Sequence, residues 1–125
     1  MTARCAVLVV DDDQGVREML AEVLELEGLD VKTAADGAQA LALMERWHPH
    51  VIVLDLNMPV MDGWAFRQAQ RGRPIIADIP IIVFSASYRA TENIDVLNAA
   101  AFISKPCDID HLLGVIGSVA QPSAR

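Results

Sequence analysis

The sequence is poor in cysteine and has no long apolar run. Its two cysteines, Cys5 and Cys107, lie far apart and in no metal-type spacing, which is typical of free thiols in a reducing compartment. No apolar stretch approaches the roughly 18 residues that a membrane span needs, and the first residues lack the pattern of a secretory signal. We therefore expect a cytoplasmic protein that does not contact a membrane.

Basic residues are also scarce. The chain has 10 lysines and arginines against 17 aspartates and glutamates, which gives a formal net charge of −7. Such a surface repels the phosphates of nucleic acids and anionic lipids, so direct binding to either is not expected. With 53% hydrophobic and 22% charged residues, the chain is predicted to form one compact domain over residues 1–120, followed by a short polar tail at 121–125.

Short apolar runs alternate along the chain with segments of helical periodicity. This alternation is typical of an α/β fold in which helices cover both faces of a parallel sheet. We predict a doubly wound sheet of five strands in (βα)5 order. The predicted strands are residues 6–10, 30–33, 51–54, 81–84 and 101–103.

Apolar residues at helical spacing mark three of the connecting helices. They are Val16, Leu20, Val23 and Leu24 in the first set, Leu41, Met44 and Trp47 in the second, and Ile109, Leu112, Leu113, Ile116 and Val119 in the last. Gly28 is expected to close the first helix and Asn98 the fourth, because both residue types tolerate the left-handed backbone of a helix end.

Polar residues follow four of the five strands. They are Asp11–Asp13, Asp55, Ser85 and Lys105–Pro106. Taken singly, each has an ordinary explanation as a helix cap, a turn former or a solvated charge. In a doubly wound sheet, however, they all reach the edge where ligands bind. At least three carboxylates would repel one another there unless a cation lay between them, whereas Asp13, next to the helix, is best interpreted as its cap.

The residues at this edge favour Mg²⁺ and phosphoryl chemistry. Oxygen ligands without nearby histidine or cysteine select a hard cation, and a site that retains water suits Mg²⁺ better than Ca²⁺. The metal and Lys105 would neutralise phosphate oxygens, and Ser85 would donate a hydrogen bond. Asp55, ionised at neutral pH without a general base, would attack phosphorus to give an aspartyl phosphate.

Four motifs make a family resemblance specific. In chain order they are VLVVDDD, VIVLDLNMPVMDG, IPIIVFSAS and AFISKP. With these motifs the chain resembles a receiver domain of the two-component response regulators over essentially its whole length. The resemblance implies a flavodoxin-like (βα)5 fold with strand order 2-1-3-4-5.

The resemblance also implies roles for the residues that act on the phosphoryl group. Asp55 is the phosphoacceptor, Lys105 binds the phosphoryl oxygens, and Ser85 follows the phosphoryl group as a switch residue. Phe102 stands at the position of the switch aromatic, where tyrosine is common. Because phenylalanine has no hydroxyl to favour an outward rotamer, we expect the inward rotamer of Phe102 to be well populated even without phosphorylation.

A metal site is implied in the same way. The resemblance gives Asp12 and Asp55 as direct Mg²⁺ ligands together with the backbone carbonyl of Asn57, and it places Asp11 outside the direct ligands. No other cofactor is implied. The Lys105–Pro106 peptide bond is usually cis in the family.

Three departures from the family pattern concern the surface that partners would contact. Cys107 replaces a usual phenylalanine, and Asn98–Ala99 replaces the commoner Gly-Ala. The stretch from Ser85 to Lys105 is slightly short, so the fourth helix is expected to be trimmed. None of these changes touches the acceptor chemistry.

The resemblance therefore predicts a signalling switch, not an enzyme with a separate substrate. The domain would accept a phosphoryl group from a histidine kinase or a phosphotransfer protein and present an altered surface to a downstream protein or domain. Its only catalysis would be Mg²⁺-dependent autophosphorylation and autodephosphorylation. A weak homodimer through the last two helices and the last strand is compatible with this role.

Three other functions share parts of the pattern. A phosphatase of the haloacid-dehalogenase type also uses a nucleophilic aspartate with Mg²⁺, but it needs a second carboxylate where Asn57 stands. A flavodoxin-like binder of flavin or nucleotide needs a phosphate-binding first loop, where Asp11–Asp13 would repel phosphate. A receiver used only as a docking module is a third alternative, although the intact set of site residues argues against it.

Two histidines and a tryptophan are interpreted as structural. His48 and His50 flank Pro49 before the third strand, at the end of the strand opposite to the acidic residues, and are expected in a surface loop. Trp64 begins the third helix just after Gly63 and is expected to pack against the core.

Overall fold

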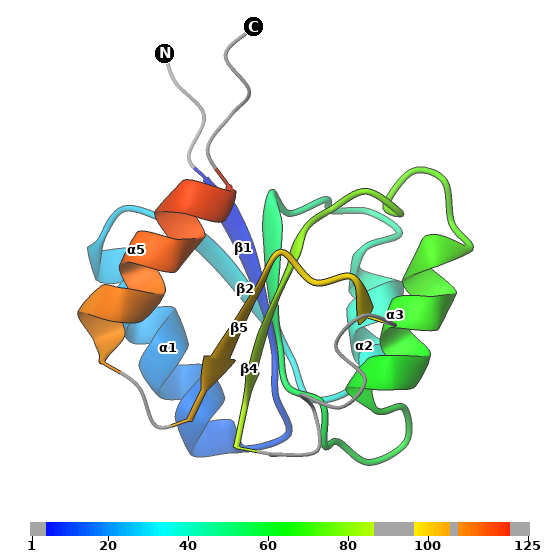
Figure 1. Ribbon diagram of the computed structural model, residues 1–125, viewed down its shortest axis with the longest axis horizontal. Coiled ribbons are helices and arrows are strands. Elements are labelled where there is room, and N and C mark those ends of the chain that lie inside the picture. The colour runs from blue at the N-terminus through cyan, green and yellow to red at the C-terminus, as the bar shows by residue number, and fades with distance from the viewer. Residues whose placement is uncertain (1–4, 87–96, 106–107, 121–125) are drawn as a thin grey trace, which may run out of the picture.

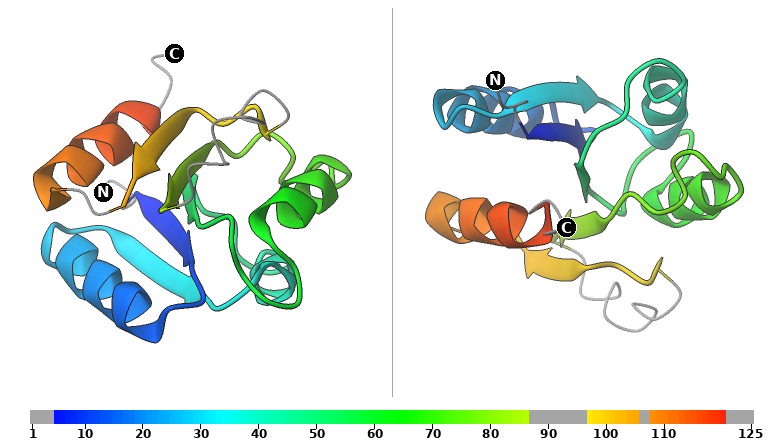
Figure 2. Two further views of the ribbon diagram at one scale, coloured as in Figure 1. Left: turned by 60° about the horizontal axis from the view of Figure 1, so that its bottom comes forward. Right: turned by 90° about the horizontal axis from the view of Figure 1, so that it is seen from above.

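The computed structural model describes residues 5–86, 97–105 and 108–120. They form a five-stranded parallel sheet with the predicted order β2-β1-β3-β4-β5. Helices α1 and α5 cover one face of the sheet, and α2 and α3 cover the other (Figure 1 and Figure 2). The elements are β1 Ala6–Val10, α1 Gln14–Leu26, β2 Asp30–Ala34, α2 Gly37–Leu43, β3 Val51–Leu54, α3 Gly63–Arg71, β4 Ile81–Ser85, β5 Ala101–Ser104 and α5 Ile109–Val119.

The central strand β3 contributes to two hydrophobic cores. Ile52 and Leu54 lie in the core that includes α2 and α3, whereas Val51 and Val53 lie in the core that includes α1 and α5. Every residue of β1, β3 and β4 is buried. Burial on both faces explains why these strands are continuous apolar runs instead of alternating apolar and polar residues.

The predicted strands agree with the observed ones to within one residue. β1 and β3 match at both ends, and the other three strands each extend one residue further, to Ala34, Ser85 and Ser104. None of the helices in the described part of the chain has the length and apolar character needed to cross a membrane.

The second predicted helix ends earlier than its apolar spacing suggests, and this prediction was wrong. α2 stops at Leu43, so Trp47 lies beyond it. The Glu45 N–H donates to the Ala42 carbonyl at 3.3 Å, three residues back, which is the tighter hydrogen-bond pattern of a 3₁₀ turn. Met44 is still buried, so the spacing identified a core position although it misplaced the helix end.

An aspartate precedes each of the helices α1, α2, α3 and α5. In each case the side chain accepts a hydrogen bond from a backbone N–H of the first turn, which satisfies a donor that has no partner within the helix. The four caps are Asp13, Asp36, Asp62 and Asp108. The predicted role of Asp13 as a cap is therefore confirmed.

The two residues expected to close helices adopt the predicted backbone. Gly28 has φ +88° just after α1, and Asn98 has φ +49°. Both angles lie in the left-handed region that glycine and asparagine tolerate best. Most of the predicted fourth helix falls in residues 87–96, outside the described part of the chain.

Helix α3 begins very close to the segment that follows β3. A Cβ atom at Gly63 would lie 2.7 Å from the carbonyl oxygen of Asp55 and 2.8 Å from the Cα atom of Leu56. The Gly63 N–H donates to the Leu56 carbonyl at 3.0 Å. The absence of a side chain at residue 63 therefore lets α3 support the backbone that carries Asp55.

Replacing Gly63 with alanine should destabilise the protein, because the new Cβ would meet backbone atoms that cannot rotate away. Overpacking of this kind costs about 1–3 kcal/mol. Gly114→Ala is the matched control, since a Cβ at Gly114 in α5 would have no heavy atom within 4 Å. That substitution should instead stabilise the protein by roughly 0.5–1 kcal/mol. Urea unfolding measures both effects, and equal free energies of unfolding for the two variants would contradict the close approach at Gly63.

Candidate functional site

The carboxyl ends of the strands bring the predicted site residues together. Asp11 and Asp55 directly follow the neighbouring strands β1 and β3, and the Asp55 N–H donates to the Val10 carbonyl at 2.9 Å. Ser85 ends β4 and Lys105 follows the adjacent β5, where the Lys105 N–H donates to the Ser85 carbonyl at 3.1 Å. The parallel register thus places Asp11 and Lys105, 94 positions apart in the sequence, in contact.

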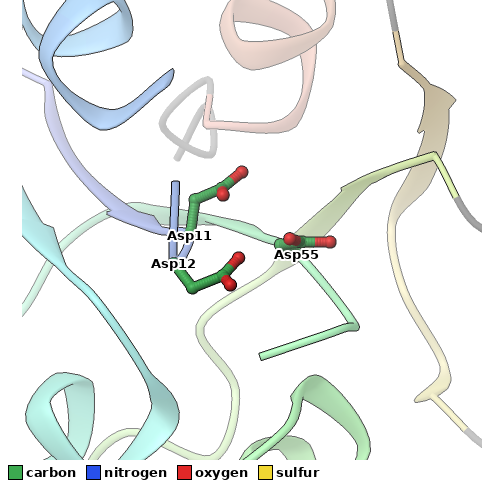
Figure 3. Close-up of side chains that lie close together, drawn as sticks. All are labelled: Asp11, Asp12 and Asp55. Carbon is green, nitrogen blue, oxygen red and sulfur yellow. The ribbon is translucent and has the colours of Figure 1, made fainter. Parts of the chain in front are cut away.

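Three carboxylates share this edge of the sheet. Asp11, Asp12 and Asp55 each offer an oxygen atom, and these oxygens lie within 4.8 Å of one another. Figure 3 shows the three side chains gathered beyond β1 and β3. Asp11 and Asp55 are only 2% and 7% exposed, whereas Asp12 is exposed to solvent. The cluster therefore consists of two buried carboxylates and a third that opens to solvent.

Lys105 adds a positive charge to this acidic cluster. Its Nζ atom lies 2.6 Å from Asp11 Oδ2 and 3.7 Å from Asp55 Oδ2. The same Nζ atom lies 5.3 Å from the centroid of the Phe84 ring. The lysine side chain is 19% exposed, and partial burial strengthens Coulomb attraction relative to water. Lys105 therefore offsets part of the repulsion among the three carboxylates.

Burial is the largest influence on the pKa of the Asp55 carboxyl. Desolvation raises the pKa of the Asp55 carboxyl, the Lys105 ammonium lowers it, and the Asp11 carboxylate raises it. Hydrogen bonds from the Asn57 N–H and the Ser85 hydroxyl also lower the pKa, but the net shift is upward. A cation placed against Asp55 would favour the ionised form, since an opposite charge stabilises the carboxylate.

The other predicted site residues differ in their exposure. Ser85 is buried and its hydroxyl hydrogen-bonds to Asp55. Asn57 is exposed, and its N–H lies 3.4 Å from Asp55 Oδ1, which makes a long hydrogen bond. Phe102 is half-buried and packs against the core that contains Val83. The expected preference of Phe102 for an inward rotamer stays a prediction.

Two contacts that hold Asp11 were not predicted from the sequence. Arg17 Nη1 donates to the Asp11 carbonyl at 2.8 Å from the first turns of α1, and the Asp13 N–H donates to Asp11 Oδ1 at 2.9 Å. Together with Lys105, they fix both the backbone and the carboxylate of Asp11. The available signal was an arginine in the helix that follows the acidic run, but such a residue is usually only a solvated charge.

Residues interpreted as structural lie away from the acidic cluster. His50 Nδ1 accepts the Ala6 N–H at 2.9 Å, where β1 begins, so this histidine is at the end of the sheet opposite to the carboxylates. His48 is exposed, and Trp64 packs against the core as predicted. The predictions for Pro106 and Cys107 concern residues outside the described part of the chain.

The acidic cluster suits a hard divalent cation. Its possible ligands are carboxylate oxygens, and Asp12 is open to solvent, so an ion could enter and keep some of its water. Lys105 contributes one positive charge against three carboxylates. The excess negative charge is what a bound cation would balance.

Protein-family comparison identifies related sequences. A family model described as the response regulator receiver domain matches residues 7–117. The transcriptional regulatory protein PrrA of Mycobacterium tuberculosis is 42% identical over 117 residues, which are 92% of this chain and 49% of that protein. The probable transcriptional regulator ycf27 of Porphyridium aerugineum is 38% identical over 117 residues, or 92% of this chain and 48% of that protein. The chain thus spans about half the length of these curated relatives.

Solved structures match the fold over most of its length. The chemotaxis response regulator CheY4 of Vibrio cholerae aligns with a TM-score of 0.86 at 32% identity, covering 94% of this chain and 99% of that one. The response regulator TrrA of Thermotoga maritima, in complex with Mg(2+)-BeF, aligns with a TM-score of 0.81 at 27% identity, covering 91% and 97%. Because the sequence match extends across most of the domain and the strand order agrees, this chain belongs to the response regulator receiver domain family.

Proposed function

We propose that this domain accepts a phosphoryl group on Asp55 from the phosphohistidine of a histidine kinase or a phosphotransfer protein. The observation that carries the proposal is the buried Asp55 carboxylate, with Lys105 Nζ 3.7 Å away and the carboxylates of Asp11 and Asp12 beside it. Grouping like charges in a partly buried site is costly. Their location at the ligand-binding edge of an α/β sheet therefore favours a functional role over a structural one.

The proposed reaction is a phosphoryl transfer to a carboxylate. One oxygen of ionised Asp55 forms a bond to phosphorus while the bond between phosphorus and the donor imidazole nitrogen breaks. The electron pair of the broken bond stays on that nitrogen, so the domain supplies no proton to the step. Lys105 and the Ser85 hydroxyl bind the phosphoryl oxygens and stabilise the charge that gathers on them.

The residues that would hold Mg²⁺ are Asp12, Asp55 and the backbone carbonyl of Asn57. When bound, the metal would neutralise charge on the phosphoryl oxygens. Asp11 already pairs with Lys105 at 2.6 Å, which supports Asp12 as the direct ligand and Asp11 as a residue outside the direct ligands. Asp12 is also the exposed member of the acidic cluster, where an ion would arrive from solvent.

The signal would come from a movement of Ser85 and Phe102. A phosphoryl group on Asp55 adds charge and acceptor oxygens next to the Ser85 hydroxyl, and this would draw Ser85 toward the new oxygens. Phe102 lies on β5, paired with Val83 of the same strand as Ser85, and is half-buried. The ring would then enter the space that Ser85 leaves and change the surface around β5.

We infer that residues 1–120 act as a cytoplasmic signalling domain whose output passes through a downstream protein or domain. PrrA and ycf27 are transcriptional regulators by name and are about twice as long as the matched region, which supports an output carried by other residues. The domain would have no separate substrate. Its catalysis would be limited to Mg²⁺-dependent gain and loss of its own phosphoryl group.

Incubation with Mg²⁺ and acetyl phosphate should add a single phosphoryl group to the wild-type chain, as measured by intact mass. Asp55→Asn and addition of EDTA should each abolish the adduct, because one removes the nucleophile and the other removes the metal. Asp30→Asn is the control, since Asp30 is exposed at the start of β2, and it should be labelled like wild type. An unlabelled wild-type chain, under conditions that label another receiver, would instead favour a docking module with an idle acidic cluster.

Lys105→Met should have opposite effects on metal binding and on phosphorylation. Loss of a positive charge close to the carboxylates should tighten Mg²⁺ binding by about tenfold or more. Loss of a donor to the phosphoryl oxygens should slow adduct formation by roughly 100-fold. Tryptophan fluorescence of Trp64, with Trp47 replaced by phenylalanine, measures the affinity, and intact mass measures the rate.

The control for this experiment is Lys32→Met, since Lys32 lies on β2 with its Nζ atom 5.5 Å from the Trp47 ring centroid. In a chain that retains Trp47, Lys32→Met should leave the Mg²⁺ affinity, measured by calorimetry, and the rate of adduct formation unchanged. If Lys105→Met bound Mg²⁺ more weakly and was also labelled more slowly, the proposal that Lys105 binds the phosphoryl group but opposes Mg²⁺ binding would be contradicted.

Asp55→Asn should raise the stability of the metal-free protein at neutral pH. Because folding raises the pKa of Asp55, the folded state binds more protons than the unfolded chain between the two pKa values, and stability falls as pH rises through that window. Asparagine does not titrate. The stability gain of the variant should therefore be largest above the pKa of Asp55 in the folded state. It should shrink as the pH falls toward the pKa of Asp55 in the unfolded chain. Urea unfolding in EDTA over a pH series measures this gain. A stability gain that grew as the pH fell would show that folding does not raise the pKa of Asp55.

A further inference from the structure

A buried arginine lies outside the acidic cluster. Arg67 is in the middle of α3 and only 6% of its surface is exposed. Arginine is seldom buried unless a carboxylate pairs with it. Within residues 5–86, 97–105 and 108–120, however, no ion pair joins Arg67 to an acidic side chain. Desolvation, followed by the charge of Arg71, lowers the pKa of Arg67. The proposed phosphoryl chemistry does not use this residue.

Neutral oxygen atoms accept the hydrogen bonds of the Arg67 guanidinium. Nε donates to the Leu97 carbonyl at 2.7 Å, and Nη2 donates to the Asn98 carbonyl at 3.1 Å. Leu97 is helical and Asn98 turns away with φ +49°. Carbonyls at a helix end have no partner within the helix and carry partial negative charge, which a cation stabilises. Arg67 thus caps residues 97–98 from a different helix.

Gln70 extends this network to a second segment. Its Oε1 atom accepts a hydrogen bond from Arg67 Nη1 at 2.8 Å. Its Nε2 atom donates to the Ile76 carbonyl at 2.8 Å and to the Ile79 carbonyl at 3.0 Å, in the turn before β4. Gln70 itself is fully buried. Two side chains of α3, one turn apart, therefore hold residues 97–98 and residues 76–79, and we call this pair the Arg67–Gln70 clamp.

The clamp acts on the chain between the two proposed switch residues. Residues 97–98 follow Ser85 and precede Phe102, and the Ala100 N–H donates to the Ile81 carbonyl at 2.8 Å. The first residue of α3, Gly63, lies against the carbonyl of Asp55. A single helix therefore supports the backbone of the acceptor at its start and holds the approach to β5 through Arg67.

We propose that Arg67 and Gln70 are positioning residues that keep residues 97–98 and 76–79 fixed on α3 in both the free and the phosphorylated domain. The part that concerns phosphorylation rests on the function proposed above. Under this proposal, residues 97–98 are the stationary base of the switch. The movements of Ser85 and of the Phe102 side chain then take place on either side of this base in the sequence.

The chemistry of the two side chains explains why they suit this role. The planar guanidinium reaches three acceptors in fixed directions, which a lysine ammonium on a flexible stem cannot do. The amide of Gln70 accepts from Arg67 and donates to two carbonyls at once. Loss of Arg67 removes the side-chain donors to the Leu97 and Asn98 carbonyls, and loss of Gln70 removes those to the Ile76 and Ile79 carbonyls. Either loss favours local opening of the segment that carries these carbonyls.

Hydrogen exchange of individual amides, followed by NMR on the full chain, tests the clamp. The Ala100 N–H reports on residues 97–98, and the Ile79 N–H, which donates to the Ile76 carbonyl at 3.2 Å, reports on the turn. Arg67→Lys should speed exchange at Ala100 by about tenfold or more, with little change at Ile79. Gln70→Glu keeps an acceptor for Arg67 but removes the donors to the turn, so it should show the reverse pattern.

The matched control is Gln68→Ala, at an exposed position of α3 between the two clamp residues, and it should leave both amides unchanged. Circular dichroism verifies that each variant is folded, and Arg67→Met replaces Arg67→Lys if the lysine variant is not. Equal exchange rates of the Ala100 amide in Arg67→Lys and in Gln68→Ala would overturn the clamp. A uniform increase at both amides in both variants would also overturn it, because it would show only a general loss of stability.

The stationary base is tested by adding Mg²⁺ and beryllium fluoride, which mimics a phosphoryl group on a carboxylate. In the wild-type chain, exchange at Ala100 should change less than about threefold while amides near Ser85 change more, and in Arg67→Lys the change at Ala100 should exceed tenfold. A wild-type change at Ala100 as large as that near Ser85 would overturn the stationary base. If beryllium fluoride alters no amide around Asp55, the proposed function and the stationary base fail together, and the exchange patterns without it still decide the clamp.

Discussion

Electrostatic repulsion among three carboxylates is the constraint around which this domain is arranged. Asp11, Asp12 and Asp55 offer oxygens within 4.8 Å of one another, and two of the three residues are buried. Such a group is unfavourable in isolation. It persists because the sheet fixes the backbone on both sides and because Lys105 offsets part of the repulsion. Every residue of β1 and β3 is buried, and these strands pair directly up to Val10 and Leu54. The apolar core thus stabilises the edge at which a cation and a phosphoryl group would bind in the proposed function.

The two sides of the sheet edge differ in how tightly they are held. Toward α3, Gly63 brings the helix into contact with the backbone of Asp55, and Arg67 and Gln70 bind the carbonyls of two further segments. Toward β5, Phe102 and Lys105 are only half-buried. A switch needs one part that stays in place and another that moves, because a displacement is useful only relative to a fixed frame. In the proposed switch, α3 and the segments bound to it would be the fixed part.

Most of the fold and the acidic cluster could be predicted because both follow from simple rules. Buried parallel strands are apolar runs, and the carboxyl ends of parallel strands meet at one edge. What could not be predicted depends on contacts between segments that are distant in sequence. Arg67 and Gln70 look like ordinary polar residues of a surface helix, and only their burial shows otherwise. The backbone of Val60 could not be predicted either, because nothing in its side chain indicates φ +66°, a left-handed conformation that costs roughly 1–2 kcal/mol.

The pairing of Lys105 with Asp11 has a consequence for the acceptor. An ammonium in close contact with a carboxylate stabilises its negative charge and makes it a weaker nucleophile. Lys105 lies 2.6 Å from Asp11 Oδ2 but 3.7 Å from Asp55 Oδ2, so its closest contact is with the carboxylate that is not the nucleophile. The pKa of Asp55 is raised mainly by burial, in spite of the lysine. In the proposed reaction, Asp11 would therefore hold the Lys105 ammonium near the phosphoryl group, while Asp55 would keep more of its nucleophilicity.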